Sequence, residues 1–599
     1  MSINNKFLKR VKYFEKKESK YKKLYDFIST LRLVTIILAL ALTYVFIKVE
    51  RSPYISYGMI SSYALFIFLI IKHANISSKL KRAKCMIAIN QKYIDRMNNK
   101  WVDFSDSGEE NLDADYPYLE DLDIFGKESL FQLINTTNTF YGRKKLIRLL
   151  KKPEKNIEDI LERQEAVKEL SEKIDFCQEL DYYGQCREKS MQDPTGLLNY
   201  YENSSKVIKT QWIKGIIYIL PIITILTFFL VISLKMYQFS YLLLFFAILH
   251  IVVCIIGFFK ISPILNSLHK FKNDLESYAN ILALIEKEKF NSNYLKKLKS
   301  DLFCKDGSAS KSIKKLNKTV DMIDLRYNAI LYGILNIILL WDYRCLFSLE
   351  KWKDSYGRLV RKWTEVIAEF ESVSSLAVLL QINPKWTFPK FTTQNTMFSA
   401  EEMGHPLIDD ESRVCNDVNI KNNIFIVTGS NMSGKTTFLR TIGVNLILAY
   451  AGAPVCSKDL KCSIMDIFTS MRISDNLNEG LSTFYAELIR IKMIIEHLPK
   501  RRPMIFLIDE IFRGTNSKDR IIGAKNVIKH LSRDWVIGLM STHDFELCDL
   551  ENRDKIKNYH FSESYSDGQI GFDYKLREGR SYTTNARYLM KMVGIEITE

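Results

Sequence analysis

The segment TGSNMSGKTT at residues 428–437 constrains the fold of this chain more than any other feature. Its glycine, lysine and threonine positions match G-x-x-x-x-G-K-[ST], the spacing of a phosphate-binding loop. A buried-strand pattern precedes it at 424–427, and a helical pattern follows at 438–448. Glycines let successive backbone N–H groups and the helix N-terminus face the phosphates of a nucleotide. The pattern predicts an α/β P-loop NTPase domain that binds ATP, in preference to a chance glycine-rich turn.

The residue types in this loop suit a nucleotide bound with a metal ion. Lys435 is expected to reach the β- and γ-phosphates of ATP, and the Thr436 hydroxyl to bind Mg²⁺. The residues expected to contact the nucleotide are Gly429, Ser430, Asn431, Met432, Ser433, Gly434, Lys435, Thr436 and Thr437.

Two further strand ends supply the groups that hydrolysis needs. The apolar run 505–508 ends in Asp509 and Glu510. We expect Asp509 to hold Mg²⁺ through water and Glu510 to orient or deprotonate the attacking water. His543 follows the apolar run 535–540 and is a second candidate catalytic residue, because a polar group there can sense the γ-phosphate. The alternatives are a buried strand that happens to end in two acids and a structural histidine.

Four segments together resemble the ATPase domain of the MutS family of DNA mismatch-repair proteins. In chain order they are TGSNMSGKTTFLRTIG, EGLSTFYAEL, FLIDEIFRGTNSKDR and STHDFEL. Residues 129–170 resemble the start of the MutS core through T-x-x-G-R-x-x-L and R-x-x-A-V-x-x-L, and residues 572–594 resemble the end of the ATPase domain. The resemblance covers residues 386–599 and 120–175. It implies an ABC-type ATPase domain that follows a mostly α-helical core.

The resemblance also implies a reaction and partners. These are hydrolysis of ATP to ADP and phosphate, a homodimer, and mismatched or branched DNA. In this family G-x-S-T-F lies at the dimer interface, so Ser482 and Thr483 are expected to complete the ATP site of the opposite subunit. The alternative for this pair is a helix N-cap, and both roles are compatible.

Three parts of the family are not recognisable in this sequence. No counterpart of the mismatch-reading domain, with its F-x-E wedge, precedes residue 120. The place of the DNA clamp holds an apolar block, and no C-terminal helix-turn-helix extension is expected. We therefore expect recognition of branched DNA, or tethering of DNA to the membrane, rather than detection of single mismatches.

Four apolar stretches predict two transmembrane helical hairpins. Residues 215–234 and 239–259 contain no Asp, Glu, Lys or Arg and are separated by four residues. Each is long enough to cross a hydrocarbon core of about 30 Å. A second pair, 33–47 and 54–71, lies near the N-terminus, and its first arm is short at fifteen residues. Buried helices of a soluble protein are the alternative, above all for 33–47, and a cleaved signal peptide is not expected.

The positive charge is concentrated beside the first hairpin. Residues 1–100 contain 20 Lys plus Arg and 5 Asp plus Glu, a net charge of +15. Since the whole chain carries +16, residues 101–599 sum to +1. This is the positive-inside pattern of a multi-pass protein of the cell membrane, with both termini and the ATPase domain in the cytoplasm. The basic flanks can also bind anionic lipid headgroups, and binding of nucleic acid by these lysines is the alternative.

These features predict five parts of the chain. They are 1–100 with the first hairpin, 101–210 with a linker and the first part of the core, 211–260 with the second hairpin, 261–385 with lever helices, and 386–599 with the ATPase. The linker is inferred from the acidic and polar residues 101–125, and long helices are expected at 281–298 and 328–371. Ten scattered cysteines without a C-x-x-C pair predict reduced thiols and no zinc site.

Three hypotheses for the function follow. The first is a membrane-anchored MutS-like ATPase, a dimeric switch that acts on DNA or tethers it to the membrane. The second is a transporter of the ATP-cassette type, although the L-S-G-G-Q signature is absent. The third is a membrane ATPase that remodels a protein partner without nucleic acid. Stimulation of ATP hydrolysis by DNA, by a solute or by neither distinguishes these hypotheses.

Overall fold

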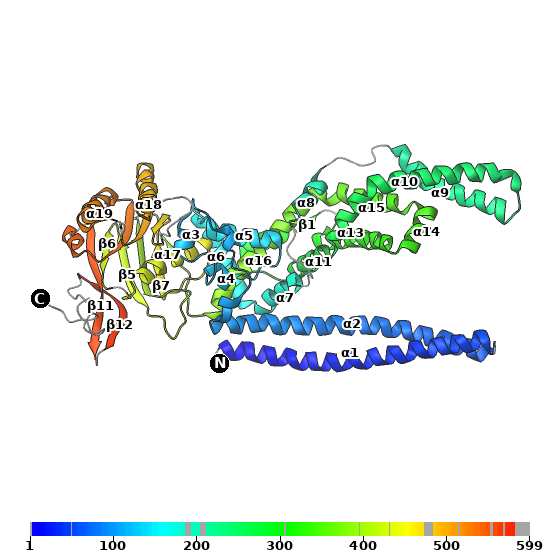
Figure 1. Ribbon diagram of the computed structural model, residues 1–599, viewed down its shortest axis with the longest axis horizontal. Coiled ribbons are helices and arrows are strands. Elements are labelled where there is room, and N and C mark those ends of the chain that lie inside the picture. Colours follow the sequence, from blue (N-terminus) through cyan, green and yellow to red (C-terminus); the bar gives the residue numbers. More distant parts are fainter. Residues whose placement is uncertain are drawn as a thin grey trace. The chain divides into compact units, whose positions relative to one another are not determined.

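The computed structural model describes residues 3–49, 51–185, 193–203, 211–304, 307–394, 396–430, 432–472, 483–512, 515–551, 555–566 and 569–580. The chain forms two compact units, whose elements are drawn in Figure 1. The first unit comprises Met1–Asn135, Leu149–Gln164 and Leu376–Glu599, and the second comprises Thr136–Arg148 and Glu165–Ser375.

A six-stranded sheet forms the centre of the first unit. Its order is β12-β11-β6-β10-β9-β8, and every pair is parallel except β11 and β12. The three central strands, β6, β10 and β9, are buried along their whole length, as in a parallel sheet covered on both faces. The strands expected at 424–427, 505–508 and 535–540 are thereby confirmed. The strand bounds are β6 Ile424–Thr428, β8 Asp466–Ser470, β9 Met504–Asp509, β10 Val536–Thr542, β11 Ile556–Ser566 and β12 Gln569–Glu578.

The helix expected after the phosphate loop is α17, which runs from Lys435 to Ala451. It begins after Gly434 and ends before Gly452, and both glycines have left-handed backbone angles, with φ of 101° and 77°. A left-handed residue after the last turn ends a helix at little cost only when it is glycine. The other helices of this region are α18 (Thr483–His497) and α19 (Ser517–Leu531).

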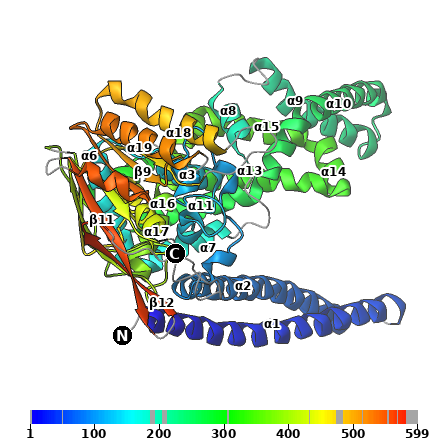
Figure 2. The ribbon, with the colours of Figure 1, turned by 60° about the vertical axis from the view of Figure 1, so that its left-hand side comes forward.

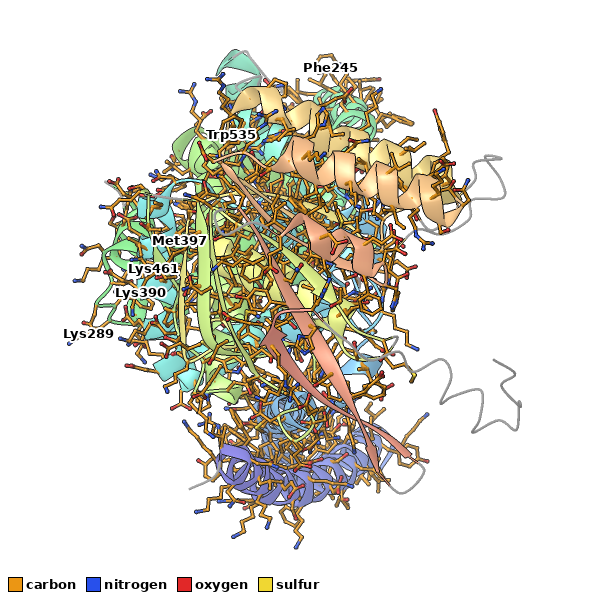
Figure 3. All side chains as sticks on the ribbon, turned by 90° about the vertical axis from the view of Figure 1, so that its left-hand side faces the viewer. Phe245, Lys289, Lys390, Met397, Lys461 and Trp535 are labelled. Atoms are coloured by element: carbon orange, nitrogen blue, oxygen red, sulfur yellow. The ribbon has the colours of Figure 1, made fainter. Side chains whose placement is uncertain are left out.

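A smaller four-stranded sheet, ordered β3-β7-β4-β5, belongs to the same unit. Lys390 of β3 pairs with Lys461 of β7, and both residues are labelled in Figure 3. The strand bounds are β3 Lys390–Phe391, β4 Met397–Met403, β5 Asn416–Lys421 and β7 Asp459–Cys462.

The acidic segment 101–125 is folded into the first unit, which differs from the linker we expected. It contains the 3-10 helices η1 (Lys100–Asp103) and η2 (Glu109–Asn111) and the short helix α3 (Tyr118–Asp121), and α4 (Leu130–Ile134) follows it. Leu119 and Leu122 are fully buried. A Cβ atom added to Gly443 of α17 would lie 2.5 Å from Leu122, so this segment packs directly on α17. Composition suggested a linker, but its apolar residues are anchored in the core.

The first hairpin is much longer than its apolar stretches. Helices α1 (Ile3–Lys48) and α2 (Pro53–Met97) lie side by side (Figures 1 and 2). Most of their large exposed apolar side chains lie toward the turn that joins them, in the stretches expected to span a membrane. At the other end Phe7 stacks on Tyr93, and the buried Arg96 donates to the Leu133 carbonyl. Each helix is about 68 Å long, more than twice the hydrocarbon thickness of a bilayer.

In its described residues the second unit is helical apart from the antiparallel strands β1 (Phe303–Cys304) and β2 (Gly307–Ser308). The second expected hairpin corresponds to α9 and α10, and Phe245 of α10 is 60% exposed (Figure 3). The remaining helix bounds are α5 Phe140–Lys151, α6 Ile157–Glu172, α7 Ile174–Gln185, α8 Thr195–Glu202, α9 Gln211–Ile232, α10 Ser240–Lys270, α11 Lys272–Lys287, α12 Asn293–Ser300, α13 Ala309–Asp324, α14 Ala329–Leu339, α15 Trp341–Tyr356 and α16 Val360–Ile382.

Both long helices expected in this unit are interrupted. The stretch 281–298 breaks between α11 and α12, where the Ser292 hydroxyl accepts from the Leu295 amide and starts a new helix. The stretch 328–371 breaks at Leu340, whose φ of 50° is left-handed, and again between α15 and α16. The apolar periodicity is continuous across these breaks, so periodicity alone does not locate them.

Three helices among the described residues are long and apolar enough to cross a membrane. They are α1, α2 and the helical stretch Tyr237–Lys270 that contains α10. The apolar part of α9, Ile217–Ile232, is shorter. Three of the four expected spans therefore meet this criterion of length and composition.

The T-x-x-G-R motif near the start of the core has a steric explanation. A Cβ atom on Gly142 would lie 1.8 Å from Oε2 of Glu371. That carboxylate cannot move freely, because it accepts hydrogen bonds from the amides of Asn138 and Thr139 and from the Thr139 hydroxyl.

We expect Gly142→Ala to destabilise the second unit by about 1–3 kcal/mol through overpacking. The thermal unfolding midpoint tests this, with Gly196→Ala as control because a Cβ there meets nothing within 4 Å. Equal midpoints for the two variants would contradict the explanation.

Candidate nucleotide-binding site

The phosphate loop connects β6 to α17 at the C-terminal edge of the central sheet. Gly429 has a φ of 149°, and a Cβ atom there would lie 2.8 Å from the Ser433 hydroxyl. A Cβ atom on Gly434 would lie 3.0 Å from the ring of Tyr574. Both glycines are therefore required by backbone angle and by space. Met432 also has a left-handed φ of 72°, and Asn431 lies outside the described residues.

Two buried hydroxyl groups in the loop fit a phosphate ligand. The side-chain oxygens of Ser430 and Ser433 are buried and have no hydrogen-bond partner within the described residues. A buried polar group without a partner costs about 1–3 kcal/mol, and phosphate oxygens would remove that cost. Together with the glycine backbone and the start of α17, these hydroxyls form a cradle suited to an anion.

The Lys435 ammonium group is bonded to the backbone of the phosphate loop. Only 5% of this residue is exposed, and its Nζ atom donates to the carbonyls of Gly429 and Ser430, each at 2.8 Å. The same atom is 3.4 Å from Nε2 of His543. A cation held at this place can contact the terminal phosphates of a nucleotide bound in the cradle.

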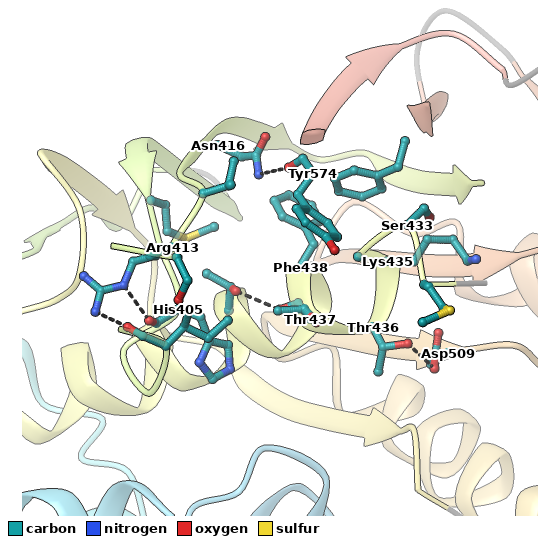
Figure 4. A pocket seen from close by; sticks show the side chains of 18 of the residues that line it. His405, Arg413, Asn416, Ser433, Lys435, Thr436, Thr437, Phe438, Asp509 and Tyr574 are labelled. Atoms are coloured by element: carbon teal, nitrogen blue, oxygen red, sulfur yellow. Dashed lines mark hydrogen bonds between the residues drawn. The ribbon is translucent and has the colours of Figure 1, made fainter. Parts of the chain in front are cut away.

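Thr436 and Asp509 meet at the position expected for a metal ion. The Thr436 hydroxyl donates to Oδ2 of Asp509 at 2.8 Å, and the Ser541 hydroxyl donates to Oδ1 (Figure 4 shows the first of these bonds). A hydroxyl and a carboxylate are the oxygen ligands that Mg²⁺ prefers. The residues present therefore fit this ion. Ser541 was not among the residues we expected, although it pairs with Asp509 in the register of β10 and β9.

Glu510 and His543 face each other beside the lysine. Oε1 of Glu510 is 2.7 Å from Nε2 of His543. Glu510 has a left-handed φ of 55°, and its amide donates to the Ser541 carbonyl at 3.1 Å. Such strained backbone angles in non-glycine residues gather at functional sites. The sequence placed these two residues at separate strand ends, and the structure brings them together.

Arg520 fixes the segment that follows His543, a contact the sequence did not suggest. Its guanidinium group makes two hydrogen bonds to the Asp544 carboxylate, at 2.8 and 2.7 Å. This paired geometry is the strong form of an arginine–carboxylate contact, and it raises the pKa of Arg520.

A cavity of about 830 Å³ opens beside the loop (Figure 4). This volume is within the range of small-molecule sites. One part of its wall combines apolar and aromatic side chains with a buried imidazole. The residues of that part are Met403, His405, Ile408, Phe438, Phe561 and Tyr574. His405 belongs to the 404–407 segment, which precedes the central strands in the sequence.

His405 is electrically neutral near pH 7. Burial, reinforced by Arg440 and Arg413, lowers the pKa of its imidazole to about 4. Its Nδ1 atom accepts a hydrogen bond from the Leu407 amide at 3.3 Å, which a protonated Nδ1 could not do. The wall therefore presents a neutral polar edge, which suits the base of a nucleotide better than its phosphates.

The Asn416 side chain of β5 links the last strand, β12, to this wall by two hydrogen bonds. Nδ2 of Asn416 donates to the Tyr574 carbonyl at 2.9 Å, and its Oδ1 accepts from the Leu576 amide at 2.8 Å. Tyr574 itself has a left-handed φ of 53°. Neither residue could be identified from a motif, because both act through the position of their backbone.

Two family models match this chain, MutS domain III over residues 117–377 and MutS domain V over residues 425–596. The chain belongs to the MutS family through its domains III and V. MutS domain V is an ABC-type ATPase domain, and it contains the β6–α17 loop and the Asp509–Glu510 strand end described above.

Curated relatives resemble only part of this chain. The DNA mismatch repair protein MutS of Aquifex pyrophilus is 33% identical over 239 residues, which is 38% of this chain and 27% of that protein. The protein of the same name from Lactobacillus johnsonii is 28% identical over 263 residues, 42% of this chain and 30% of that protein. That from Staphylococcus haemolyticus is 30% identical over 247 residues, 40% of this chain and 28% of that protein. Each match spans under a third of the relative's length.

The family's G-x-S-T-F motif falls largely outside the described part of this MutS chain. Ser482 lies outside it, and Thr483 is the first residue of α18, with its side chain not described. Thr437, the last of the expected loop residues, lines the cavity, and its carbonyl accepts from the Thr441 hydroxyl at 2.7 Å.

Proposed function

We propose that this chain is a membrane-anchored MutS-type ATPase that works as a homodimeric, ATP-driven switch on DNA. The observation that carries the proposal is the convergence of Lys435, Glu510 and His543, in which the imidazole contacts both charged groups. The pair of Thr436 and Asp509 lies beside them. A cation, a carboxylate base and a metal-binding pair around a phosphate cradle are the parts that ATP hydrolysis requires.

The proposed reaction is attack of water on the γ-phosphorus of ATP. Glu510 accepts a proton from that water while the new oxygen–phosphorus bond forms and the bond to ADP breaks. Lys435 stabilises the negative charge of the transferred group, and the contact with His543 orients the Glu510 carboxylate. Mg²⁺ held by Thr436 and Asp509 would neutralise charge on the β- and γ-phosphate oxygens. Ser541 keeps Asp509 in place through its hydroxyl group.

The dimer is proposed from the family resemblance. Ser482 and Thr483 would reach the γ-phosphate bound by the opposite subunit, which closes two composite sites when ATP is present. The ATP-bound state then gains contacts that the ADP-bound state lacks, and such a difference is what a conformational switch requires.

Membrane anchoring rests on the apolar helices. The exposed apolar side chains of α1, α2, α9 and α10 form stretches without acidic or basic residues. Exposing this apolar surface to water would cost a free energy of about 25 cal/mol for each Å². The positive-inside pattern supports a cytoplasmic location for domain V.

DNA is proposed as the partner because the curated relatives carry the name of DNA mismatch repair. Steady-state ATP hydrolysis by the full chain in lipid nanodiscs tests it, with homoduplex, singly mismatched and four-way-junction DNA added in turn. We expect the junction to change the turnover rate about fivefold or more, the lower end of typical couplings between sites. Glu510→Gln serves as the control for contaminating ATPases.

A turnover rate that no DNA alters would overturn the DNA part of the proposal. Robust basal hydrolysis in the same experiment would keep the ATPase assignment. The remaining function would then be a membrane ATPase that acts on a solute or a protein, for which the net charge of only +1 on residues 101–599 gives some support.

A further inference from the structure

Helix α14 exposes an entirely apolar face. This helix, Ala329–Leu339, carries five large aliphatic side chains with exposed fractions between 37% and 78%. They are Ile330, Leu331, Ile334, Ile337 and Ile338. No acidic or basic residue occurs between Arg326 and Asp342. Isolated apolar side chains on a surface are ordinary, but a continuous face of this kind marks an interaction site.

The polar side chains of α14 point inward. The Tyr332 hydroxyl donates to Oδ2 of Asp342 at 2.8 Å, and the amide of Asn336, which is 9% exposed, donates to that hydroxyl at 3.4 Å. Asp342 is 1% exposed and pairs with Arg326, with Nε and Oδ1 2.8 Å apart. A surface helix in water has the opposite arrangement, apolar toward the core and polar toward solvent. The polarity of α14 is therefore inverted.

A side chain also bonds one backbone group at each end of this helix. At the start, Oδ1 of Asn328 accepts from the Leu331 amide at 3.1 Å. At the end, Nε of Arg344 donates to the Leu339 carbonyl at 2.9 Å. Helix ends in water can leave these groups to solvent, whereas helix ends in hydrocarbon need partners within the protein.

The helix lies against the apolar hairpin of the same unit. It contacts α9 and α10, and Figures 1 and 2 both show it beside them. The Asn336 carbonyl is 3.5 Å from Sγ of Cys254 and 3.5 Å from Nε2 of the buried His250, both on α10. Arg326 reaches α10 as well, through Ser262 and through Oδ1 of Asn266 at 3.2 Å. The exposed apolar surface of α14 therefore continues that of the proposed membrane hairpin.

Length and direction show how α14 can enter a bilayer. Eleven residues rise about 16 Å, roughly half of a hydrocarbon core of about 30 Å. The helix turns by 112° from the preceding stretch Ala309–Tyr327. At its far end the left-handed Leu340 turns the chain into α15. A bent pair of this kind is either a broken span or a re-entrant loop, and the short length of α14 favours the second.

We propose that α14 is a re-entrant membrane helix whose exposed face contacts the acyl chains of one leaflet. The inference rests on the proposed anchoring of α9 and α10 in the membrane, and it adds a third embedded element to that hairpin. The cluster of Arg326, Asp342, Tyr332 and Asn336, in which Asp342 and Asn336 are buried, fixes the bend that lets the helix enter. A second copy of the chain, packed on the same face, is the competing occupant.

Photo-crosslinking from single positions tests this proposal. Benzoylphenylalanine replaces Ile330 or Ile337 of α14, Ile251 of α10 as the reference inside the membrane, and Ile522 of α19 as the reference in water. Ile251, Ile337 and Ile522 are exposed to similar extents, at 56%, 67% and 50%. Each full-length variant is reconstituted into phosphatidylcholine–phosphatidylglycerol vesicles, its ATPase activity is checked, and lipid adducts are measured by mass spectrometry.

We expect lipid adducts at positions 330 and 337 at about the yield of position 251. That yield should be at least about tenfold above position 522, because acyl chains contact only side chains within the hydrocarbon. Adducts at 251 without adducts at 330 and 337 would overturn the re-entrant helix and leave the hairpin anchor intact. Adducts at none of these positions would overturn both. Crosslinks from 330 or 337 to a second copy of the chain would assign the face to an oligomer interface.

Discussion

Glu510→Gln should bind ATP as tightly as the original chain and hydrolyse it about 100- to 10,000-fold more slowly, the loss typical for a general base. Glutamine preserves the shape of the side chain and can still contact His543, which lies 2.7 Å from the carboxylate. It cannot accept a proton from water at neutral pH. Equilibrium binding of a fluorescent ATP analogue and single-turnover hydrolysis measure the two properties separately.

The matched control is Glu546→Gln, an exposed glutamate three residues beyond His543 that does not line the cavity. Its turnover should equal that of the original chain. Hydrolysis by Glu510→Gln at the rate of this control would remove Glu510 from the catalytic role. Weakened ATP binding with unchanged turnover of the bound nucleotide would instead assign Glu510 to binding.

Asp121→Ala should lower the free energy of unfolding of the first unit by about 3 kcal/mol, because one buried carboxylate serves several donors. Asp121 is 0% exposed. It accepts from the Thr469 hydroxyl at 2.6 Å, from the Arg472 amide at 2.9 Å and from the Arg490 guanidinium at 2.8 Å. Alanine leaves these donors without their acceptor. The thermal midpoint of the detergent-solubilised chain should fall by several degrees.

Glu120→Ala provides the control, since Glu120 is the exposed neighbour of Asp121 on the same short helix. It loses the same kind of charge without breaking a buried network, so its midpoint should stay close to that of the original chain. Equal midpoints for the two variants would show that the Asp121 network does not hold segment 118–125 on domain V.

The local parts of the site could be predicted from the sequence, whereas the contacts between distant residues could not. The loop from Gly429 to Thr437 and the acids at 509 and 510 are consecutive residues whose spacing carries their chemistry. Ser541 was missed because its role depends on the register that places it opposite Asp509. Asn416 was missed because it acts on the backbone of a strand about 160 residues later.

The expectation drawn from composition was wrong for segment 101–125, because one of its charged residues is buried. The acidic residues of 101–125 suggested a solvated linker, but Asp121 is the most deeply buried of them and pairs with Arg490. Apolar periodicity likewise predicted unbroken helices through 281–298 and 328–371. The breaks there depend on single residues, such as the left-handed Leu340, whose backbone angle leaves no trace in a pattern of apolar positions.

Because the first hairpin is so long, its basic residues fall into two groups. One group borders the apolar stretches, and the other lies far from them. In the proposed topology Arg32 and Lys72 border the apolar stretches and lie at the lipid headgroups. Lys6 belongs to α1, as Arg32 does, but it is about 40 Å from Leu33 along the helix axis. The Debye length in physiological salt is about 8 Å, so the potential of the membrane surface does not reach that far. Salt therefore screens the lysines at the start of α1, and their influence on any partner falls as the salt concentration rises.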